Sequence, residues 1–285
     1  MSVKSYLVHF YFGLRHFFFY FRKIIIRLYS PDNGEFSGSE SHLQDSIKSL
    51  KRLGWMKLSS DRLLIEPDKL KPLIERANYL LNSQNELKET ASKVATIDKN
   101  FKVTIDDLFD RSELLNVIND RNIVKVAKGY LNTKPFLQQA SVWWDCPVPG
   151  EERDSQTFHA DGDDPNLLKV FIYLNDVSKD DGPFVFIEKS HLLLRKFFLI
   201  LKYGVASIKQ CDIKNEDAKN IKYCVGKAGD IFMADTNGFH KGLKAEKNSK
   251  GRILLHLVFC SEWPTGSFKS TKSLVPSMSV DDLSI

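Results

Sequence analysis

RILLHLVFC, residues 252–260, is a nearly unbroken run of aliphatic and aromatic residues. It is the last of a set of short apolar segments, each bounded by Gly, Asp, Asn or Pro, and this pattern is typical of the strands of a β-sandwich or barrel. The set comprises residues 136–144, 155–160, 168–174, 183–188, 229–234 and 252–260. We therefore predict that the C-terminal half of the chain is mostly β.

The N-terminal half has a helical periodicity instead. Apolar residues recur at spacings of three and four, which places them on one face of a helix. On this basis we expect helices over residues 43–53, 67–81, 105–117 and 119–131. Gly54 stands where a helix C-cap would, and Pro67 suits the first position of the second helix. The fold class we predict is mainly β with flanking helices.

Flanking segments set the domain boundaries. Residues 1–30 are predicted to form an amphipathic segment, 31–41 a linker rich in Ser, Gly, Pro and Asp, 42–265 the main domain and 266–285 a frayed tail. Within the main domain we expect a helical part, 42–131, and a β core, 136–262, with an insertion at 191–222. The insertion starts with the apolar HLLLRKFFLIL, for which we expect a helix that covers the pocket as a lid or extends the apolar surface begun by the N-terminal segment.

Composition excludes several classes of protein. The 285 residues are 42% hydrophobic and 27% charged, which is ordinary for a globular chain. Lys+Arg 41 minus Asp+Glu 36 gives a net charge of +5, and the two signs are interleaved, so we expect no nucleic-acid partner. The four cysteines lack the close spacing of a zinc site, which favours free thiols in a reducing compartment and hence a cytoplasmic protein.

Residues 6–29 are the one compositional anomaly. They are rich in aromatics, but Arg15, Arg22, Lys23 and Arg27 interrupt the apolar run before it reaches the ~18 residues of a membrane span. No signal-peptide cleavage pattern follows them. Two interpretations remain open: a basic amphipathic helix that makes peripheral contact with a membrane surface, or a helix that packs on its own domain or on a partner chain.

Three polar residues of the β half suggest a metal centre. His159 and Asp161 in TFHADGDD are two positions apart, so on a strand their side chains share a face. His240 in ADTNGFHKG, 240 − 161 = 79 residues later, would supply a second imidazole. Two imidazoles and one carboxylate on one face of a metal leave coordination positions open, and this arrangement suits non-haem Fe(II).

Arg252 and His256 would lie on one face of the last strand. Arg252 follows His240 by 252 − 240 = 12 residues, and its planar guanidinium can bind a carboxylate through two parallel hydrogen bonds. His256 would either contact substrate, orient a neighbouring group or serve as a hydrogen-bonded core residue. Trp143 and Trp144 end an earlier strand near the expected pocket; at least one of them should belong to the core.

These residues carry a family resemblance. The chain resembles the phytanoyl-CoA dioxygenase-like branch of the Fe(II)/2-oxoglutarate-dependent dioxygenases over residues ~136–262. The motifs in order are His159-x-Asp161, LLKVFIYLNDV, DDGPFVFIEKSH, GDIFMADTNGFHKG and GRILLHLVF. The resemblance implies a double-stranded β-helix, the jelly roll of cupin-like proteins. It also implies Fe(II) held by His159, Asp161 and His240, 2-oxoglutarate anchored by Arg252, O₂ as oxidant, and Tyr173 facing the co-substrate.

Two departures from the family pattern accompany the resemblance. Many relatives carry a hydroxyl residue two places after the distal histidine, where this chain has Gly242. The usual Pro-Gly-Ser-His appears as Glu-Lys-Ser190-His191, and we expect His191 to be structural. The carboxylate at Asp161 favours hydroxylation, because related halogenases have a small residue there.

The predicted function is an Fe(II)/2-oxoglutarate-dependent dioxygenase. It would hydroxylate an unactivated C–H position of a small organic or lipid-like substrate and release succinate and CO₂. The alternative is a catalytically silent member of the same fold that binds a ligand without turnover, or a membrane-surface scaffold, since a fold does not guarantee an activity.

Overall fold

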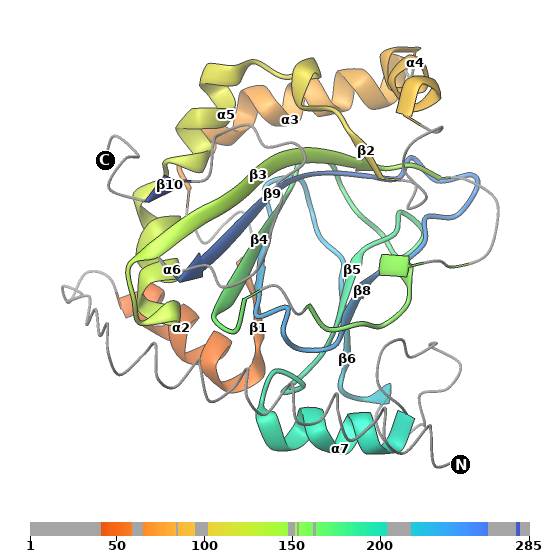
Figure 1. Cartoon of the computed structure of the whole chain (residues 1–285). Helices are drawn as coiled ribbons and strands as arrows, with labels where there is room; N and C mark the ends of the chain where they lie inside the picture. Colours follow the sequence, from red (N-terminus) through yellow and green to blue (C-terminus); the bar gives the residue numbers. More distant parts are fainter. Residues whose placement is uncertain are drawn as a thin grey trace.

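A computed structural model describes residues 41–58, 65–83, 85–94, 102–147, 152, 154–161, 164–203, 218–261 and 278–279 (Figure 1). The predicted N-terminal segment, all of the predicted linker except Ser41, and nearly all of the predicted tail lie outside these residues. The N-terminal part holds α2 (Ser41–Leu53), β1 (Trp55–Leu58), α3 (Pro67–Ser83), α4 (Asn85–Val94), β2 (Lys102–Thr104), the 3-10 helix η2 (Asp106–Leu108), α5 (Arg111–Ile118) and α6 (Arg121–Leu131). The C-terminal part holds β3 (Pro135–Asp145), the 3-10 helix η3 (Asp154–Gln156), β4 (Leu167–Tyr173), β5 (Phe184–Ile187), α7 (Leu193–Tyr203), β6 (Ile221–Cys224), β7 (Ile231–Ala234), β8 (His240–Gly242), β9 (Arg252–Ser261) and β10 (Met278–Ser279).

The described strands form two antiparallel sheets. The large sheet has the order β1-β7-β4-β9-β3-β10, with β2 also paired to β3, and the small sheet has the order β6-β5-β8. Strand β9 lies between β3 and β4, and its register pairs Arg252 with Asp145 and His256 with both Ser141 and Phe171. Directly paired residues point to the same face of a sheet, so these side chains all face the small sheet.

The two sheets enclose an aromatic layer. Phe171 and Tyr173 of β4 belong to the same buried cluster as Phe184 and Phe186 of β5. The Phe171 and Phe184 rings are stacked, with centroids 4.5 Å apart. The Tyr173 hydroxyl donates a hydrogen bond to the Cys224 carbonyl oxygen of β6 at 2.7 Å, which ties one sheet to the other.

Helices cover the outer faces of both sheets, and Figure 1 shows α7 apart from the other helices. The apolar faces of α2, α3, α5 and α6 share one buried cluster with alternate residues of β4, β7 and β9. Helix α7 packs instead on the small sheet, where Leu199 and Ile200 contact a cluster that includes Val185 and Ile187 of β5. Burial of these faces supplies most of the stability of such layers, because propensity alone rarely holds short helices.

The structure confirms most of the expected elements. Helices lie at the ranges expected near 43–53, 67–81 and 119–131, and a helix opens the 191–222 insertion. The helix expected over residues 105–117 is divided into η2 and α5, and the sequence patterns missed α4, β6, β8 and β10. They also missed β1 and β2, which join the large sheet from within the helical part. These two strands are only four and three residues long, too short to show a period of two.

The strand expected at 155–160 is wrong. Residues 154–156 form η3, and His159 makes a single isolated bridge with His240. The backbone leaves regular pairing here because the segment hydrogen-bonds to the turn that precedes β8, with Asp161 N donating to Thr236 O at 2.9 Å.

Candidate metal centre and its surroundings

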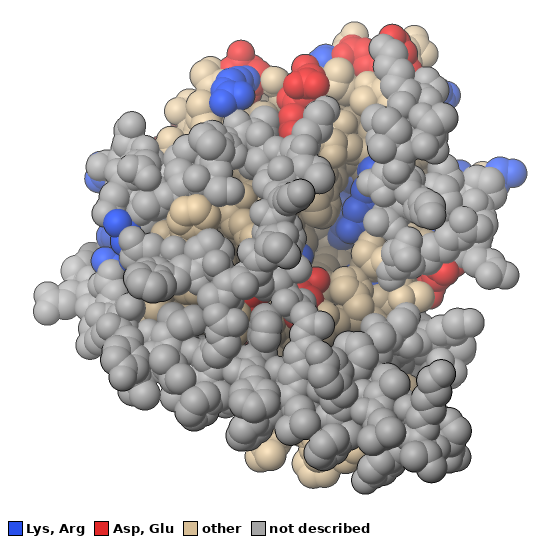
Figure 2. Space-filling model, viewed as in Figure 1, with Lys and Arg blue, Asp and Glu red and all other residues tan. Residues whose placement is uncertain are grey.

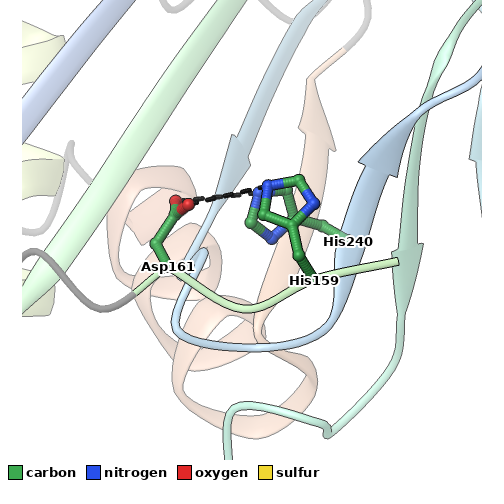
Figure 3. Close-up of side chains that lie close together, drawn as sticks. All are labelled: His159, Asp161 and His240. Atoms are coloured by element: carbon green, nitrogen blue, oxygen red, sulfur yellow. Dashed lines mark ion pairs between the residues drawn. The ribbon is translucent and has the colours of Figure 1, made fainter. Parts of the chain in front are cut away.

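His159, Asp161 and His240 converge, each offering one ligand atom within 4.8 Å of the others (Figure 3). His159 Nε2 lies 3.7 Å from Asp161 Oδ1, and His240 Nε2 lies 3.6 Å from Asp161 Oδ2. The centroids of the two imidazole rings are 4.3 Å apart. Within the described ranges this is the one such cluster of His, Cys, Asp or Glu side chains.

Backbone hydrogen bonds bring the two histidines together across 81 residues (240 − 159) of sequence. His159 N donates to His240 O, and His240 N donates to His159 O, each at 2.9 Å. A pair that exchanges both bonds in this way is directly opposed, so the two imidazoles project to the same side. The alternation that the sequence suggested for His159 and Asp161 therefore holds in effect, although the segment is not a regular strand.

The imidazole tautomers are set by carbonyl groups. Nδ1 of His159 lies 2.9 Å from Thr157 O, and Nδ1 of His240 lies 3.0 Å from Gly238 O. A carbonyl can only accept, so each Nδ1 carries the proton when the ring is neutral. Nε2 of both rings then keeps its lone pair and faces Asp161, as a metal ligand requires.

Charges in the centre favour metal binding at neutral pH. Burial lowers the pKa of His240 to about 3 and lowers that of His159. Burial opposes ionisation of Asp161, but Lys169, His240 and His159 together hold the pKa of this carboxyl below its usual value. Two neutral imidazoles and one carboxylate are the donor set of the 2-His-1-carboxylate triad.

Lys169 is a site residue that the sequence analysis missed. Its Nζ lies 2.7 Å from Asp161 Oδ2, and both side chains are largely buried. Lys169 projects from β4 toward the small sheet, and it is the one charged residue in LLKVFIYL, residues 167–174. A lysine within such an apolar run was the available signal, because lysines are rarely buried without a partner.

Arg252 lies at the other end of the same sheet face. Its guanidinium binds the Asp145 carboxylate through Nε, at 2.8 Å, and through Nη2. Its Nη1 is buried and has no hydrogen-bond partner among the described residues. Burial opposes the charge, but Asp145 and Tyr173 raise the pKa of Arg252, which remains a cation. Two nitrogens of the guanidinium are thus bound by Asp145, and the third has no hydrogen-bond partner among the described residues.

Tyr173 lies beside Arg252, with the guanidinium carbon 5.8 Å from the centre of its ring. Its hydroxyl is already engaged, since it accepts from Phe184 N at 3.2 Å and donates to Cys224 O. Burial raises the pKa of Tyr173 to about 12. These contacts give Tyr173 a structural role between the sheets.

His256 is buried and lacks hydrogen bonds. It is 1% exposed, and neither ring nitrogen has a partner among the described residues. Its ring stacks on Trp143, with centroids 4.2 Å apart, and burial holds its pKa well below the usual value. Trp144 belongs to the core, as expected for one of the two tryptophans, whereas Trp143 lies against the inner cluster with His256.

Gly242 leaves room beside Arg252. A Cβ at this position would lie 3.6 Å from Arg252 Nη2 and 4.0 Å from Ser155 O, both ordinary contacts. Ser155 Oγ is buried and has no partner among the described residues. The backbone of Ser155, in η3, therefore lies near the position where the family pattern has a hydroxyl residue.

Ser190 and His191 support the turn before β8. Ser190 Oγ accepts from Phe239 N at 2.7 Å and donates to Ile187 O at 2.6 Å. His191 packs against Gly54, and its Nε2 lies 3.2 Å from Lys51 O. The pair thus holds the chain next to His240, which fits a structural role for His191.

Comparison with known proteins finds solved structures of similar architecture. No family model matches the chain, and no curated protein sequence matches it. EctD from S. alaskensis with bound Fe has a TM-score of 0.51 and 17% identity, over 84% of this chain and 88% of that one. The same enzyme with 2-oxoglutarate and 5-hydroxyectoine has a TM-score of 0.51, 15% identity, and coverage of 85% and 88%. SnoK, a non-heme alpha ketoglutarate dependent carbocyclase from nogalamycin biosynthesis, has a TM-score of 0.51, 13% identity, and coverage of 86% and 100%.

At these identities the similarity shows the fold. The core is a double-stranded β-helix with flanking helices, as the sequence predicted.

Figure 2 shows Lys or Arg atoms, in blue, beside a hollow near the centre of the viewed face, and Asp or Glu atoms, in red, below it. No helix among the described residues is both long and apolar enough to cross a membrane.

Proposed function

We propose that this chain is an Fe(II)/2-oxoglutarate-dependent dioxygenase of the phytanoyl-CoA dioxygenase-like branch. It hydroxylates a C–H position of a small organic or lipid-like substrate and releases succinate and CO₂. The observation that carries the proposal is the convergence of His159, Asp161 and His240, with both Nε2 atoms free of protons and turned toward the carboxylate. The solved structures of similar fold, which include EctD with bound Fe and the carbocyclase SnoK, support the class of chemistry.

The described residues fit this cofactor set. His159, Asp161 and His240 would hold Fe(II), and Lys169 would bind the carboxylate oxygen of Asp161 that the metal does not use. When bound, Fe(II) with 2-oxoglutarate and O₂ supplies the oxidising chemistry, and the protein supplies geometry and a water-poor cavity. Lys169 has a positioning role here, because it would restrict how Asp161 can turn.

Arg252 would anchor the far carboxylate of 2-oxoglutarate. The unpartnered Nη1 is the donor for this contact, while Asp145 keeps the guanidinium oriented through Nε and Nη2. Hydrogen bonds between charged partners are short and strong, and a fixed guanidinium gives them direction. Tyr173 would flank the co-substrate with its ring only, because its hydroxyl is already hydrogen-bonded to Cys224 and Phe184.

Ser155 would replace the hydroxyl that the family pattern places at position 242. Its Oγ is buried without a partner, and such a group costs about 1–3 kcal/mol unless a ligand satisfies it. His256 is likewise buried without hydrogen-bond partners among the described residues, and its nitrogens would be satisfied by the organic substrate or by the co-substrate. Its ring stacks on Trp143.

Metal and co-substrate binding test the proposal directly. Wild-type protein should bind Fe(II) and 2-oxoglutarate without oxygen, giving the visible charge-transfer absorption of the chelate, and should release succinate when O₂ is admitted. His159→Ala, Asp161→Ala and His240→Ala should each lose most metal affinity, because each removes one of three protein ligands. Asp180→Ala, at an exposed acidic residue, is the matched control. If two of the three variants stay folded and keep wild-type metal binding, the centre is misplaced.

Arg252 separates co-substrate binding from metal binding. Arg252→Ala should weaken 2-oxoglutarate binding by roughly 100-fold or more while metal affinity stays within about twofold, since a buried charged pair costs several kcal/mol to break. Arg252→Lys should recover part of the loss, because an ammonium cannot reproduce the planar fork. Equal 2-oxoglutarate affinity in wild type and Arg252→Ala would defeat this assignment.

The role of Ser155 is tested by removing its hydroxyl and then adding one at position 242. Ser155→Ala should weaken 2-oxoglutarate binding about 3- to 10-fold, which corresponds to one hydrogen bond. Adding Gly242→Ser should restore binding, because a side chain fits there beside Arg252. The readout is the anaerobic 2-oxoglutarate titration, so it does not depend on turnover. A Ser155→Ala variant that binds as wild type, or a double variant that recovers nothing, removes the role.

A catalytically silent binding protein is the alternative function. It would bind metal and 2-oxoglutarate and release no succinate with any substrate or in its absence. The intact triad and Arg252 favour the enzyme, because a binding module needs no open metal positions. Steady succinate formation above a metal-free control therefore separates the two functions.

A further inference from the structure

Exposed apolar side chains of the described residues gather on one helix. Of the large hydrophobic residues that are exposed, those on α7 and at its start are Leu192 (37%), Leu194 (73%), Phe197 (45%), Phe198 (61%) and Leu201 (61%). The others in the described part of the chain, Tyr79 and Val225, lie on separate elements. Scattered exposed leucines are ordinary, but a contiguous patch on one helix marks an interaction surface.

Helix α7 has two distinct faces. Leu199 and Ile200 are buried against the small sheet, in a cluster that includes Phe158 and Phe239. Leu194, Phe198 and Leu201, spaced four and three residues apart, form an outer stripe. The sequence of the helix, LLRKFFLILKY, contains Arg195, Lys196 and Lys202 and no acidic residue, and Lys196 is buried, like Leu199 and Ile200.

We propose that the outer face of α7 docks on an anionic lipid surface. Helices that lie in a membrane interface combine Leu and Phe on one side with Arg and Lys near the headgroups, which is the composition of α7. The outer stripe offers no directional hydrogen-bonding group, which a protein partner of defined sequence would normally use. Charge complementarity specifies the lipid, because Arg195 and Lys202, the basic residues of α7 that are not buried, are attracted to anionic headgroups.

A second segment of the chain has the same character. Residues 6–29 are rich in Phe, Tyr, Leu and Ile and carry four or more basic residues. Two interfacial elements bind a bilayer more tightly than one, because the second binds as an intramolecular event. The docking inference rests on α7 and does not require the proposed catalytic function.

Docking would place the metal centre close to the lipid. The cluster under α7 includes Phe158 and Phe239, which precede His159 and His240 in the chain. One helix diameter, ~10 Å, separates this cluster from a surface that contacts the outer stripe. A lipid-like substrate would therefore reach the protein on the side that carries the candidate metal ligands.

Vesicle co-sedimentation of the full chain tests the proposal. Wild-type protein should bind vesicles of phosphatidylcholine with phosphatidylserine and bind pure phosphatidylcholine vesicles less tightly. The Leu194→Ser, Phe198→Ser double variant should lose at least ~10-fold in partition coefficient, because two inserted apolar side chains are removed. Tyr79→Ser, which removes an exposed ring from α3, is the matched control and should bind as wild type.

A direct readout locates the contact. In a Phe198→Trp variant, lipids brominated on their acyl chains should quench the added fluorescence relative to wild type. Both α7 variants change exposed positions, so melting temperatures should stay near that of wild type and report that the fold is intact. Absence of quenching, or vesicle binding unchanged in the double variant, would overturn the proposal and leave any lipid binding to residues 6–29.

Other occupants of this face give different results. If α7 pairs two copies of the chain, wild type elutes as a dimer, the double variant as a monomer, and neither binds vesicles. If residues 6–29 cover α7 within one chain, the double variant exposes Arg15, Arg22, Lys23 and Arg27 to trypsin, again without vesicle binding. Either result overturns lipid docking.

Discussion

Helices α6 and α7 each have 11 residues and each cover one sheet of the sandwich, yet they bury different amounts of their apolar surface. In α6 the large apolar residues are buried, including Ile123, Val126 and Leu131. In α7 only Leu199 and Ile200 are buried among the apolar residues, and Leu194, Phe198 and Leu201 are exposed. Two helices of equal length therefore differ in how many of their apolar side chains are buried in the fold.

The difference teaches that apolar content alone does not identify a core helix. Asp120 caps the start of α6 by accepting from Asn122 N at 3.0 Å, and Asn132 ends it in the left-handed conformation. The apolar stripe of α6 faces the large sheet, and its outer face is polar. Helix α7 has apolar residues on both faces, and those on its outer face remain exposed.

The largest expected effect comes from matched leucine truncations in the two helices. Leu131→Ala in α6 removes a fully buried side chain and should lower the free energy of unfolding by about 2–5 kcal/mol. Leu201→Ala in α7 removes a side chain that is 61% exposed and should change it by less than ~0.5 kcal/mol. Denaturant unfolding of both variants measures the pair. Equal losses would mean that α7 is covered in the folded chain and would break the comparison.

A smaller effect is expected from the tyrosines near the ends of the two helices. The Tyr130 hydroxyl of α6 donates to Asp235, which lies in the turn that leads to His240. Tyr130→Phe should cost about 1–3 kcal/mol, because it leaves a buried carboxylate short of a donor. It should also weaken metal binding, because Asp161 N bonds to Thr236 O in the same turn. Tyr203→Phe in α7 is the control. Metal affinity that is unchanged in Tyr130→Phe would show that α6 does not support the centre.

Much of the candidate site could be predicted from the sequence because residue type and order carry the signal for candidate metal ligands. His159-x-Asp161, His240 and Arg252 are specified by residue type and order, and the structure brings the first three together. Lys169 and Ser155 were not predicted, because neither belongs to a recognised ligand motif and their surroundings are known only from the folded chain. Lys169 Nζ pairs with Asp161, although only eight residues (169 − 161) separate them, and Ser155 lies near Gly242, where the family pattern has a hydroxyl.

The elements of the fold also divide into those that could be predicted from the sequence and those that could not. Long apolar strands such as β9 and periodic helices such as α3 could be predicted because their own residues carry the pattern. β1 was missed because its four residues become a strand by pairing with β7, as Trp55 with Ala234 and Leu58 with Ile231. The exposed face of α7 could not be distinguished from a buried one, since periodicity shows that a face is apolar and does not show what covers it.

The smallest expected effect is on the pH dependence of stability, which should respond to a substitution inside the sandwich and not to one on α7. In the folded protein burial holds the pKa of His256 well below its usual 6.5, so the unfolded chain takes up a proton first as the pH falls. Stability from this residue is therefore complete above pH ~6.5 and is lost below it, by about 0.8 kcal/mol at pH 6. His256→Phe should keep the stack on Trp143 and flatten the decline between pH 7 and 5, while Leu201→Ala in α7 should leave it parallel to wild type. Thermal or urea unfolding at several pH values measures the slopes. If His256→Phe and wild type decline in parallel, the imidazole is solvated or hydrogen-bonded in its charged form, and its stack on Trp143 does not exclude water.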